Sequence, residues 1–363
     1  MKKYYLTSES VTEGHPDKIC DKISDYILDA ALRIDPNSKM AVEATIKDDL
    51  ILIYGEANTK AKLNYEKLAL EVIKDIGYTE NYNVLVKVSN QSIEITNAVI
   101  KKEIMAGDQG IIFGYACNET KEMMPMPIMF ANKLAKRLTY VRKNDPNTIL
   151  KPDGKTEVVI EYIDDIPVRV DTIIIAAQHK ENINNDELDK LIINEVINKV
   201  IPKKMLKKTK ILINTSGSFT LGGSFGDSGT TGRKIVVDTY GGLGHIGGGC
   251  FSSKDPSKVD RSAAYYARFA AKNVVAHNLA DKCEIELSYA IGMAKPISVN
   301  INTFGTNHIL EDDIYKYVSD NFDFSVSNII KELDLLKPIY YNLAAYGHFG
   351  RNDLNLTWEK IKK

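Results

Sequence analysis

The sequence is poor in the residues that mark several classes of protein. Its 363 residues include one tryptophan and four cysteines, and no two cysteines form a C-x-x-C pair. This excludes a disulfide framework and a cysteine zinc site, and it favours a reducing cytoplasm. The sequence contains no run of about 18 apolar residues and no apolar leader, so neither a membrane span nor a signal peptide is expected.

Neither sign of charge is in excess. Lysine and arginine number 47, and aspartate and glutamate number 48, so no net basic field would attract nucleic acid. We therefore expect neither a nucleic-acid nor a membrane partner. The chain is longer than the size at which a single hydrophobic core usually stops growing, about 250 to 300 residues, so two or three domains are expected.

Several common catalytic signatures are also missing. The chain has no G-x-x-x-x-G-K-[ST] phosphate loop, no G-x-S-x-G elbow and no H-E-x-x-H zinc motif. A G-x-G-x-x-G pattern occurs at Gly242, Gly244 and Gly247, after the segment 233–240, which we expect to be a strand. Further loop residues and a lysine-bearing turn precede the next helix, so the dinucleotide-binding context is not met. A Rossmann-type dehydrogenase is therefore only a remote alternative.

What the chain does have is an alternation of paired strands and helices. Apolar periodicity predicts helices over 16–33, 64–76, 126–143, 186–200, 260–280 and 324–336. Strand-like stretches cover 39–57, 83–90, 157–163, 168–179, 210–216, 233–240, 283–292 and 296–304. Strands that arrive in pairs favour α+β modules over a doubly wound parallel sheet. We expect three modules, over 1–95, 96–221 and 222–363.

Glycine is concentrated in one part of the chain. Twelve of the 23 glycines lie between Gly217 and Gly249, and glycine lets a backbone approach phosphate closely, although tight turns would give the same density. The flanking charges favour a ligand site, since lysine suits a flexible polyphosphate and carboxylate suits Mg²⁺. A salt-bridge lattice at a helix start would also explain their spacing. These charges are Asp227, Arg233, Lys234, Lys254, Asp255, Lys258, Asp260 and Arg261.

A second charged cluster stands at the start of the first expected helix. The segment TEGHPDKICDK places His15, Asp17 and Lys18 around Pro16, a residue favoured in the first turn of a helix. The carboxylate could hold Mg²⁺ while the histidine and lysine address phosphate oxygens, or the residues could simply cap the helix. Together with Asp260, Asp17 would give a two-metal arrangement around a phosphate chain.

The long motifs resemble those of one family. SESVTEGHPDKICDKISDYILDA, GDQGIIFGYA, GDSGTTGRKIVVDTYGG, GGGCFSSKDPSKVDRSAAYYARFAAKNVV and AAYGHFGR occur in this order. Over nearly the whole chain they are similar to S-adenosylmethionine synthetases (methionine adenosyltransferases) of bacterial type. The resemblance implies three similar two-layer α+β domains, each a mixed sheet with helices on one face, about a pseudo-threefold axis. It also implies homodimers with active sites between the subunits, usually paired into homotetramers.

The implied reaction joins L-methionine to ATP. The methionine sulfur attacks C5′ of ATP, and the expelled triphosphate is hydrolysed to pyrophosphate and phosphate before release. A neutral thioether needs no general base, so stabilising the leaving triphosphate is the main task and no catalytic triad is expected. The implied cofactors are Mg²⁺, two per site, and K⁺.

The resemblance also implies a role for each site residue. The residues implied for the triphosphate are His15, Lys155, Arg233, Lys234 and Lys254. The other nucleotide contacts are Asp153, Gly154, Ser218, Phe219, Asp227 and Cys250, with Phe219 stacked on adenine. The implied methionine contacts are Glu56, Gln91, Asp227 and Lys258. Asp17 and Asp260 would bind Mg²⁺, Glu43 would support K⁺, and Asp108 would border the site.

The chain departs from the family pattern near the nucleotide. Ser218 stands where Arg is usual, Cys250 stands where Ala is usual, and the implied lid, over 92–110, is short. Loss of the Arg removes a fork of donors and would weaken ATP binding unless another cation substitutes. Cys250 would make activity sensitive to oxidation, and the lid would alter turnover more than chemistry. These departures keep open a second interpretation, a non-catalytic nucleotide-binding subunit of the same fold.

Overall fold

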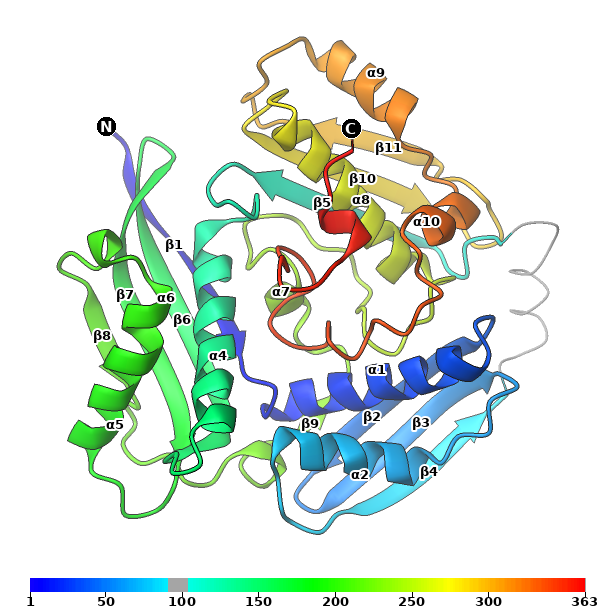
Figure 1. The fold of residues 1–363 in the computed structure, drawn as a ribbon. Helices are drawn as coiled ribbons and strands as arrows, with labels where there is room; N and C mark the ends of the chain where they lie inside the picture. Colours follow the sequence, from blue (N-terminus) through cyan, green and yellow to red (C-terminus); the bar gives the residue numbers. More distant parts are fainter. Residues whose placement is uncertain (91–103, 363) are drawn as a thin grey trace.

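The chain forms three sheets, each packed against helices (Figure 1). The computed structural model describes residues 1–90 and 104–362. Gln91 and the part of the expected lid over 92–103 lie outside the described residues. Among the described helices, none is long and apolar enough to cross a membrane.

The elements follow the chain in three groups. The first comprises β1 (Lys3–Val11), α1 (Pro16–Ile34), β2 (Lys39–Lys47), β3 (Leu50–Asn58), α2 (Tyr65–Ile76) and β4 (Asn83–Ser89). The second comprises β5 (Gly110–Cys117), α4 (Met126–Asn144), β6 (Leu150–Ile163), β7 (Ile166–His179), α5 (Asn185–Leu191), η1 (Ile192–Ile197), α6 (Asn198–Val200), η2 (Lys203–Met205) and β8 (Lys210–Ile213). The third comprises η3 (Gly223–Phe225), β9 (Gly229–Thr230), α7 (Ile235–Asp238), α8 (Val259–Ala276), β10 (Lys282–Tyr289), β11 (Ser298–Asn302), α9 (Glu311–Asn321), α10 (Val326–Glu332) and η4 (Thr357–Glu359).

Each group lends its first strand to the sheet of another. The sheets have the orders β4-β3-β2-β9, β8-β7-β6-β1 and β11-β10-β5, and the lent strands β9, β1 and β5 all pair antiparallel. On the far edge, β4 and β8 pair in parallel with their neighbours. The expected α+β fold with three similar two-layer domains is therefore confirmed. Because of the exchange, the sheets do not coincide with the contiguous segments 1–95, 96–221 and 222–363.

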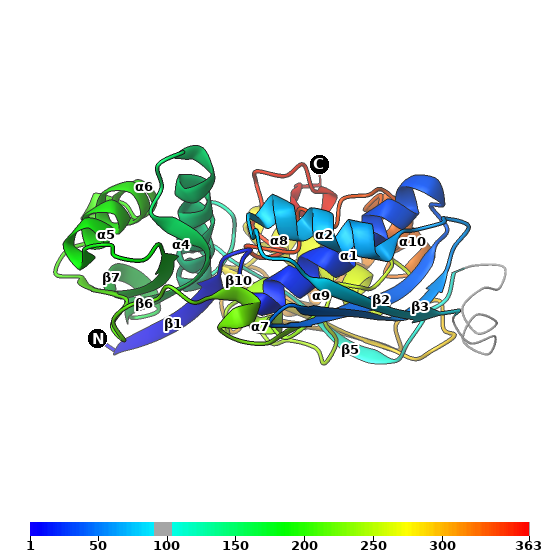
Figure 2. The ribbon, with the colours of Figure 1, turned by 90° about the horizontal axis from the view of Figure 1, so that it is seen from below.

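Side-chain alternation gives each sheet two different faces. In β2 the buried residues are Met40, Val42, Ala44 and Ile46. The alternate residues point the other way, because the side-chain period of a strand is two. Figure 2 shows α1 and α2 on one side of β2 and β3, and α4 to α6 on one side of β6 and β7. On other strands Tyr5, Leu85 and Ile111 are 48%, 57% and 46% exposed.

One expected strand is a helix, and one helix was not expected. The segment 233–240 is not a strand, because Ile235–Asp238 form the short helix α7. Lys234 and Asp238 both reach α1, and a helical turn brings positions four residues apart onto one side. The Rossmann alternative needed a strand before its glycines, and the helix removes that support. The helix α9 was missed because it is mostly polar, with only Ile314 and Val318 buried.

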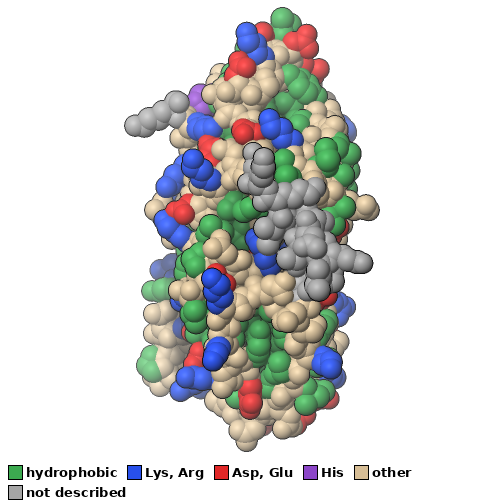
Figure 3. All heavy atoms as spheres, turned by 90° about the vertical axis from the view of Figure 1, so that its right-hand side faces the viewer, with side chains coloured by type: hydrophobic (Ala, Val, Ile, Leu, Met, Phe, Trp, Pro, Cys, Tyr) green, Lys and Arg blue, Asp and Glu red, His purple; other side chains and the backbone are tan. Residues whose placement is uncertain are grey.

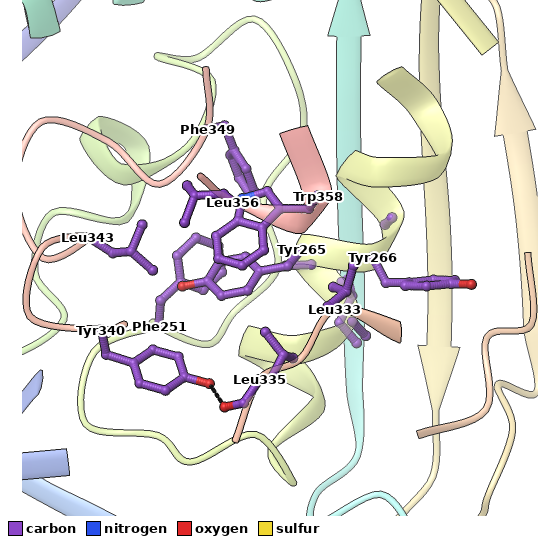
Figure 4. Packing of buried hydrophobic residues seen from close by; sticks show 14 of the residues in the cluster. Phe251, Tyr265, Tyr266, Leu333, Leu335, Tyr340, Leu343, Phe349, Leu356 and Trp358 are labelled. Atoms are coloured by element: carbon purple, nitrogen blue, oxygen red, sulfur yellow. Dashed lines mark hydrogen bonds between the residues drawn. The ribbon is translucent and has the colours of Figure 1, made fainter. Parts of the chain in front are cut away.

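An aromatic cluster anchors the loop that leads to Lys254 (Figure 4). Tyr265 stacks on Trp358 with ring centroids 4.2 Å apart and planes 11° apart. Phe251 packs edge-on against Tyr265 at 5.5 Å and against His348 at 4.9 Å. Truncating one such buried aromatic side chain typically costs about 3–5 kcal/mol. The loop is thus part of the core rather than a free surface segment.

Charges of both signs are interspersed on the face shown in Figure 3. Blue and red side chains alternate there with apolar and neutral ones, without a continuous patch of one sign. This agrees with the near balance of 47 basic and 48 acidic residues in the sequence.

Candidate active site

The first part of the site is the N-terminus of α1. His15 is the N-cap of this helix and is 2% exposed, and its Nδ1 accepts the backbone N–H of Asp17 at 3.2 Å. Burial, together with the positive charge of Lys234, lowers the pKa of His15 to about 3. The imidazole is therefore neutral near pH 7. With Nδ1 used as an acceptor, Nε2 carries the proton and can donate one hydrogen bond.

Asp17 faces two cations beside this histidine. Its Oδ1 accepts the backbone N–H of Thr230 at 3.0 Å, and its Oδ2 accepts Nζ of Lys234 at 2.7 Å. Arg233 lies 3.8 Å from Oδ1 and is more than half exposed. Burial opposes ionisation, but the hydrogen bonds from Lys234 and Thr230 outweigh it and lower the pKa of Asp17. The group is therefore a buried, ionised carboxylate.

The second part of the site is a cleft of about 790 Å³. Lys254 donates to the carboxylate of Asp260 at its wall, and Asp108 lines the same cleft. Gly249 is required beside them, because a Cβ at this position would lie 2.1 Å from the Asp260 carboxylate. The glycine-rich stretch therefore brings its backbone against the carboxylate of Asp260.

The strand β2 fixes the distance between the two parts. Thr230, which binds Asp17, pairs with Thr45 of β2, and Lys254 forms an isolated bridge with Ala41 of the same strand. Four residues separate these positions, or about 14 Å at about 3.4 Å per residue. Both parts thus lie along one edge of one sheet.

Glu43 and Glu56 lie on the face of this sheet that points away from α1 and α2. Glu56 on β3 pairs with Ala41, and Glu43 alternates with the buried residues of β2. Both side chains are half-buried, and the hydroxyl of Tyr54 donates to Glu43 at 3.3 Å. They are therefore placed on the same face as Ala41, near the bridge to Lys254.

Asp153 is a buried acid with an unused oxygen. Its Oδ2 accepts the backbone N–H of Gly223 at 2.9 Å, whereas its Oδ1 is buried and has no hydrogen-bond partner among the described residues. Burial raises the pKa of Asp153 to about 6. Buried polar atoms in native structures nearly always have a partner, so this oxygen is suited to a donor on a ligand. Next to Gly154, the exposed Lys155 pairs with Val11.

Some of the expected site residues lie together around His15, and Phe219 is bonded to the end of β7. Around His15 the structure gathers Asp17, Lys155, Asp227 and Lys234, whose charges all act on the imidazole. Ser218 is exposed, and the backbone of Phe219 is tied to His179 at the end of β7 by bonds of 3.1 and 2.9 Å.

Lys258 is engaged by a neighbour in its own turn. It donates to Asp255, which is fully buried and also accepts the backbone N–H of Met40 at 2.8 Å. Burial opposes ionisation of this acid, but Lys258 and Lys39 outweigh it and lower the pKa of Asp255 to about 2. The lysine is therefore held in place beside β2 before any ligand binds.

The expected sensitivity of Cys250 to oxidation is not supported. Burial raises the pKa of its thiol to about 11, so the reactive thiolate is scarce near pH 7. The side chain also lies against Gly232, where an added Cβ would be 2.6 Å from the sulfur.

The helix α1 carries a row of acids that was not predicted from the sequence. Four aspartates recur every fourth residue, so they share one face of the helix. Each of them accepts hydrogen bonds from residues in the third part of the chain. Asp21 accepts the N–H of Gly232 at 2.8 Å, and Arg261 donates to both oxygens of Asp25 at 2.7 and 2.8 Å. The row is Asp17, Asp21, Asp25 and Asp29. The repeated spacing was the available signal, but such a row is usually a solvated face.

The acids present fit a metal that arrives with its ligand. Within residues 1–90 and 104–362, no group of three His, Cys, Asp or Glu side chains could hold a metal ion alone. Mg²⁺ commonly takes one or two carboxylates and completes its shell with water and phosphate oxygens. Asp17 and Asp260, each an acid with a lysine partner, suit that mode of binding.

Comparison with known proteins finds similar sequences over the whole chain. Three models match successive parts of the chain: the S-adenosylmethionine synthetase N-terminal domain (3–103), central domain (103–219) and C-terminal domain (221–360). The S-adenosylmethionine synthase of Sorangium cellulosum (strain So ce56) is 50% identical over 377 residues, which cover 100% of this chain and 89% of that protein. The chain therefore belongs to the S-adenosylmethionine synthetase family.

Proposed function

We propose a role for each residue of this site in the synthesis of S-adenosyl-L-methionine from ATP and L-methionine. This is the activity of the family to which the chain belongs. One observation carries the proposal: a neutral His15 stands beside an ionised Asp17, with the charges of Lys234 and Lys155 directed at it. A neutral donor surrounded by cations suits an oxygen that gains negative charge as it leaves.

The bond changes follow from this arrangement. The methionine sulfur attacks C5′ of ATP and the C5′–O bond breaks, leaving its electron pair on the triphosphate oxygen. His15 donates through Nε2 to that oxygen, while Lys155, Arg233, Lys234 and Lys254 neutralise the phosphates. Water then cleaves the triphosphate to pyrophosphate and phosphate. No side chain has to remove a proton from the sulfur, so a site rich in cations is sufficient.

The two carboxylates supply the metal sites. Asp17 and Asp260 would hold Mg²⁺, which when bound neutralises phosphate charge in the transition state. Lys234 and Lys254, which are paired with these acids in the free protein, would turn to the phosphate oxygens. Glu43, on the outer face of β2, would support K⁺.

The remaining assignments concern the adenosine and the amino acid. The free Oδ1 of Asp153 would accept a donor of the nucleotide, alongside Gly154, Ser218, Phe219 and Cys250. Glu56 would bind the ammonium group of methionine. Lys258, held by Asp255, would face the carboxylate. Asp227 and Gln91 complete this set.

We propose that the active sites are shared between the two subunits of a homodimer, and that dimers pair into tetramers. The exposed Tyr5, Leu85 and Ile111 would be covered in such an assembly. Glu43 and Glu56 lie on the face of their sheet opposite to the described helices α1 and α2 (Figure 2). The four cysteines, all unpaired, are compatible with the proposed cytoplasmic location.

Mixing two inactive variants tests the shared site. His15→Ala and Lys254→Ala chains, unfolded and refolded together, would form heterodimers in which one site combines both intact residues. If His15 and Lys254 of one site come from different subunits, about a quarter of the wild-type activity returns. No recovery, with heterodimers shown by mass, would contradict the supply of these two residues by different subunits. Refolded wild-type protein is the control.

A further inference from the structure

Two neighbouring residues of α1 hold the two ends of α7. Asp17 accepts Nζ of Lys234 at 2.7 Å, and the next residue, Lys18, donates to Asp238. Lys234 is the N-cap of α7 and Asp238 is its last residue. The polarity is reversed between the pairs, since α1 offers an acid to one end of α7 and a base to the other.

The two pairs differ in their access to a ligand. In the outer pair, the side chain of Lys234 is 20% exposed, and Arg233 beside it is 58% exposed. In the inner pair, Lys18 is completely buried and Asp238 is 4% exposed. Lys18 also donates to Asp21 at 2.9 Å. A phosphate can therefore compete for Lys234, whereas Lys18 has no route to it.

The C-terminal segment supports the inner pair from behind. The backbone N–H of His348 donates to the carbonyl of Asp238 at 2.9 Å, and its buried Nε2 lies 3.8 Å from the Asp238 carboxylate. The hydroxyl of Tyr265 is 2.7 Å from Nδ1 of His348. The AAYGHFGR motif, none of whose residues has a role in the proposed chemistry, therefore supports the inner pair.

We propose that Lys18, Asp238 and His348 are positioning residues for the triphosphate of ATP. When Lys234 leaves Asp17 for a phosphate oxygen, the outer pair no longer ties α7 to α1. The inner pair keeps the two elements together, so Arg233 and Lys234 stay opposite Asp17. The inference rests on the proposed roles of Asp17, Arg233 and Lys234.

Asp238→Asn tests the proposal, because it keeps the shape of the side chain and removes the carboxylate to which Lys18 donates. We expect the KM for ATP to rise about tenfold or more, as for loss of a charge-assisted bond, and the KM for methionine to change less than about twofold. The affinity for magnesium tripolyphosphate, measured by calorimetry, should fall by the same factor. An unchanged affinity would overturn the proposal.

A matched control separates positioning from stability. Glu359→Gln breaks another buried cluster, with Lys272 at 2.7 Å and Arg268 at 3.1 Å, in the later turns of α8. We expect it to lower the melting temperature comparably and to leave the KM for ATP unchanged. If both variants raise that KM equally, the effect is structural and the proposal fails. Should Asp238→Asn not fold, Asp238→Glu keeps the charge, displaces it by one methylene, and should weaken tripolyphosphate binding more than Glu359→Gln does.

Lys234→Ala distinguishes failure of this inference from failure of the proposed function. If Lys234→Ala leaves tripolyphosphate binding intact, the proposed role of Lys234 is wrong. If Lys234→Ala weakens binding and Asp238→Asn does not, only the role of the inner pair is wrong.

Discussion

At the scale of single residues, burial sets the charge of the groups around the proposed nucleotide site. It contributes to a pKa of about 3 for His15, which keeps the imidazole neutral, and to a pKa of about 6 for Asp153. The Oδ1 of Asp153 is one of several buried side-chain polar atoms without a hydrogen-bond partner among the described residues. A residue kept in such a state costs stability in the free protein, as functional residues often do.

Asp153→Asn should therefore stabilise the protein in a pH-dependent way. Folding raises the pKa of this carboxyl from 3.8 to about 6, so the folded state binds the proton more tightly and wild-type stability falls as pH rises through this interval. From about pH 4 to about pH 7, the free energy of unfolding should shift in favour of the variant by about 1–3 kcal/mol. Urea titrations across this range measure the shift. A difference that does not vary with pH would contradict the assignment.

Cys250→Ala should change little. The thiol has a pKa of about 11 through burial, so alkylation by iodoacetamide near pH 7 should be much slower than for a free thiol with a pKa of about 8.5. The variant should retain wild-type activity within about twofold and the same loss of activity under mild peroxide. Mass spectrometry of the alkylated peptide and initial rates check both. Rapid modification of Cys250 with parallel inactivation would restore the oxidation hypothesis.

The sequence predicts much of the site at this scale, but not the pairing within it. His15, Asp17, Lys254 and Asp260 could be identified from their motifs. That Lys254 is paired with Asp260, and Lys258 with Asp255, depends on rotamers and burial, which a linear pattern does not specify. The same holds for Phe219, whose loop is fixed through His179.

At the scale of elements, α1 connects the site to the rest of the chain. Its aspartates accept groups from the loop at Gly232, from α8 through Arg261, and from the N–H groups of Tyr340 and Tyr341. A helix that is usually described by its apolar stripe is here fixed equally by its polar face. Buried charges of this kind are costly when one partner is lost.

Asp25→Ala should destabilise the protein strongly. It leaves Arg261, which is 1% exposed, without the carboxylate that both of its terminal nitrogens contact. The expected loss is about 3–5 kcal/mol. The control is Asp75→Ala, which removes a half-exposed partner of Lys22 and should cost less than about 1 kcal/mol. Thermal and urea midpoints of the two variants measure the contrast, and equal midpoints would show that the Asp25 pair adds no stability.

Periodicity predicts elements well where one face is apolar, and poorly elsewhere. The helices over 16–33, 64–76 and 126–143 were predicted to within one residue at each end. The lent strands β1, β5 and β9 were not predicted, because their pairing partners belong to distant parts of the chain. The segment 233–240 has a strand-like composition. However, Lys234 and Asp238 both bind α1, and this tertiary contact favours a helix over a strand.

At the scale of the whole molecule, the exchange of strands joins the three modules. β1, β5 and β9 each leave their own group, so no sheet is complete without another part of the chain. The resemblance to a family supplied the three-domain fold and the expectation of a dimer, whereas periodicity alone supplied only the count of modules. The site lies where these modules meet, since α1, β2 and the loops before α7 and α8 all contribute to it.

Product analysis tests whether this site makes S-adenosylmethionine by expelling triphosphate. Purified protein would be given ATP, L-methionine, Mg²⁺ and K⁺, with His15→Ala measured in parallel. We predict equal yields of S-adenosylmethionine, pyrophosphate and phosphate. The rate of His15→Ala should be about 10²–10³-fold lower than that of the wild type, as for loss of one oxyanion donor. Tight ATP binding without S-adenosylmethionine would contradict this prediction and would favour a non-catalytic subunit.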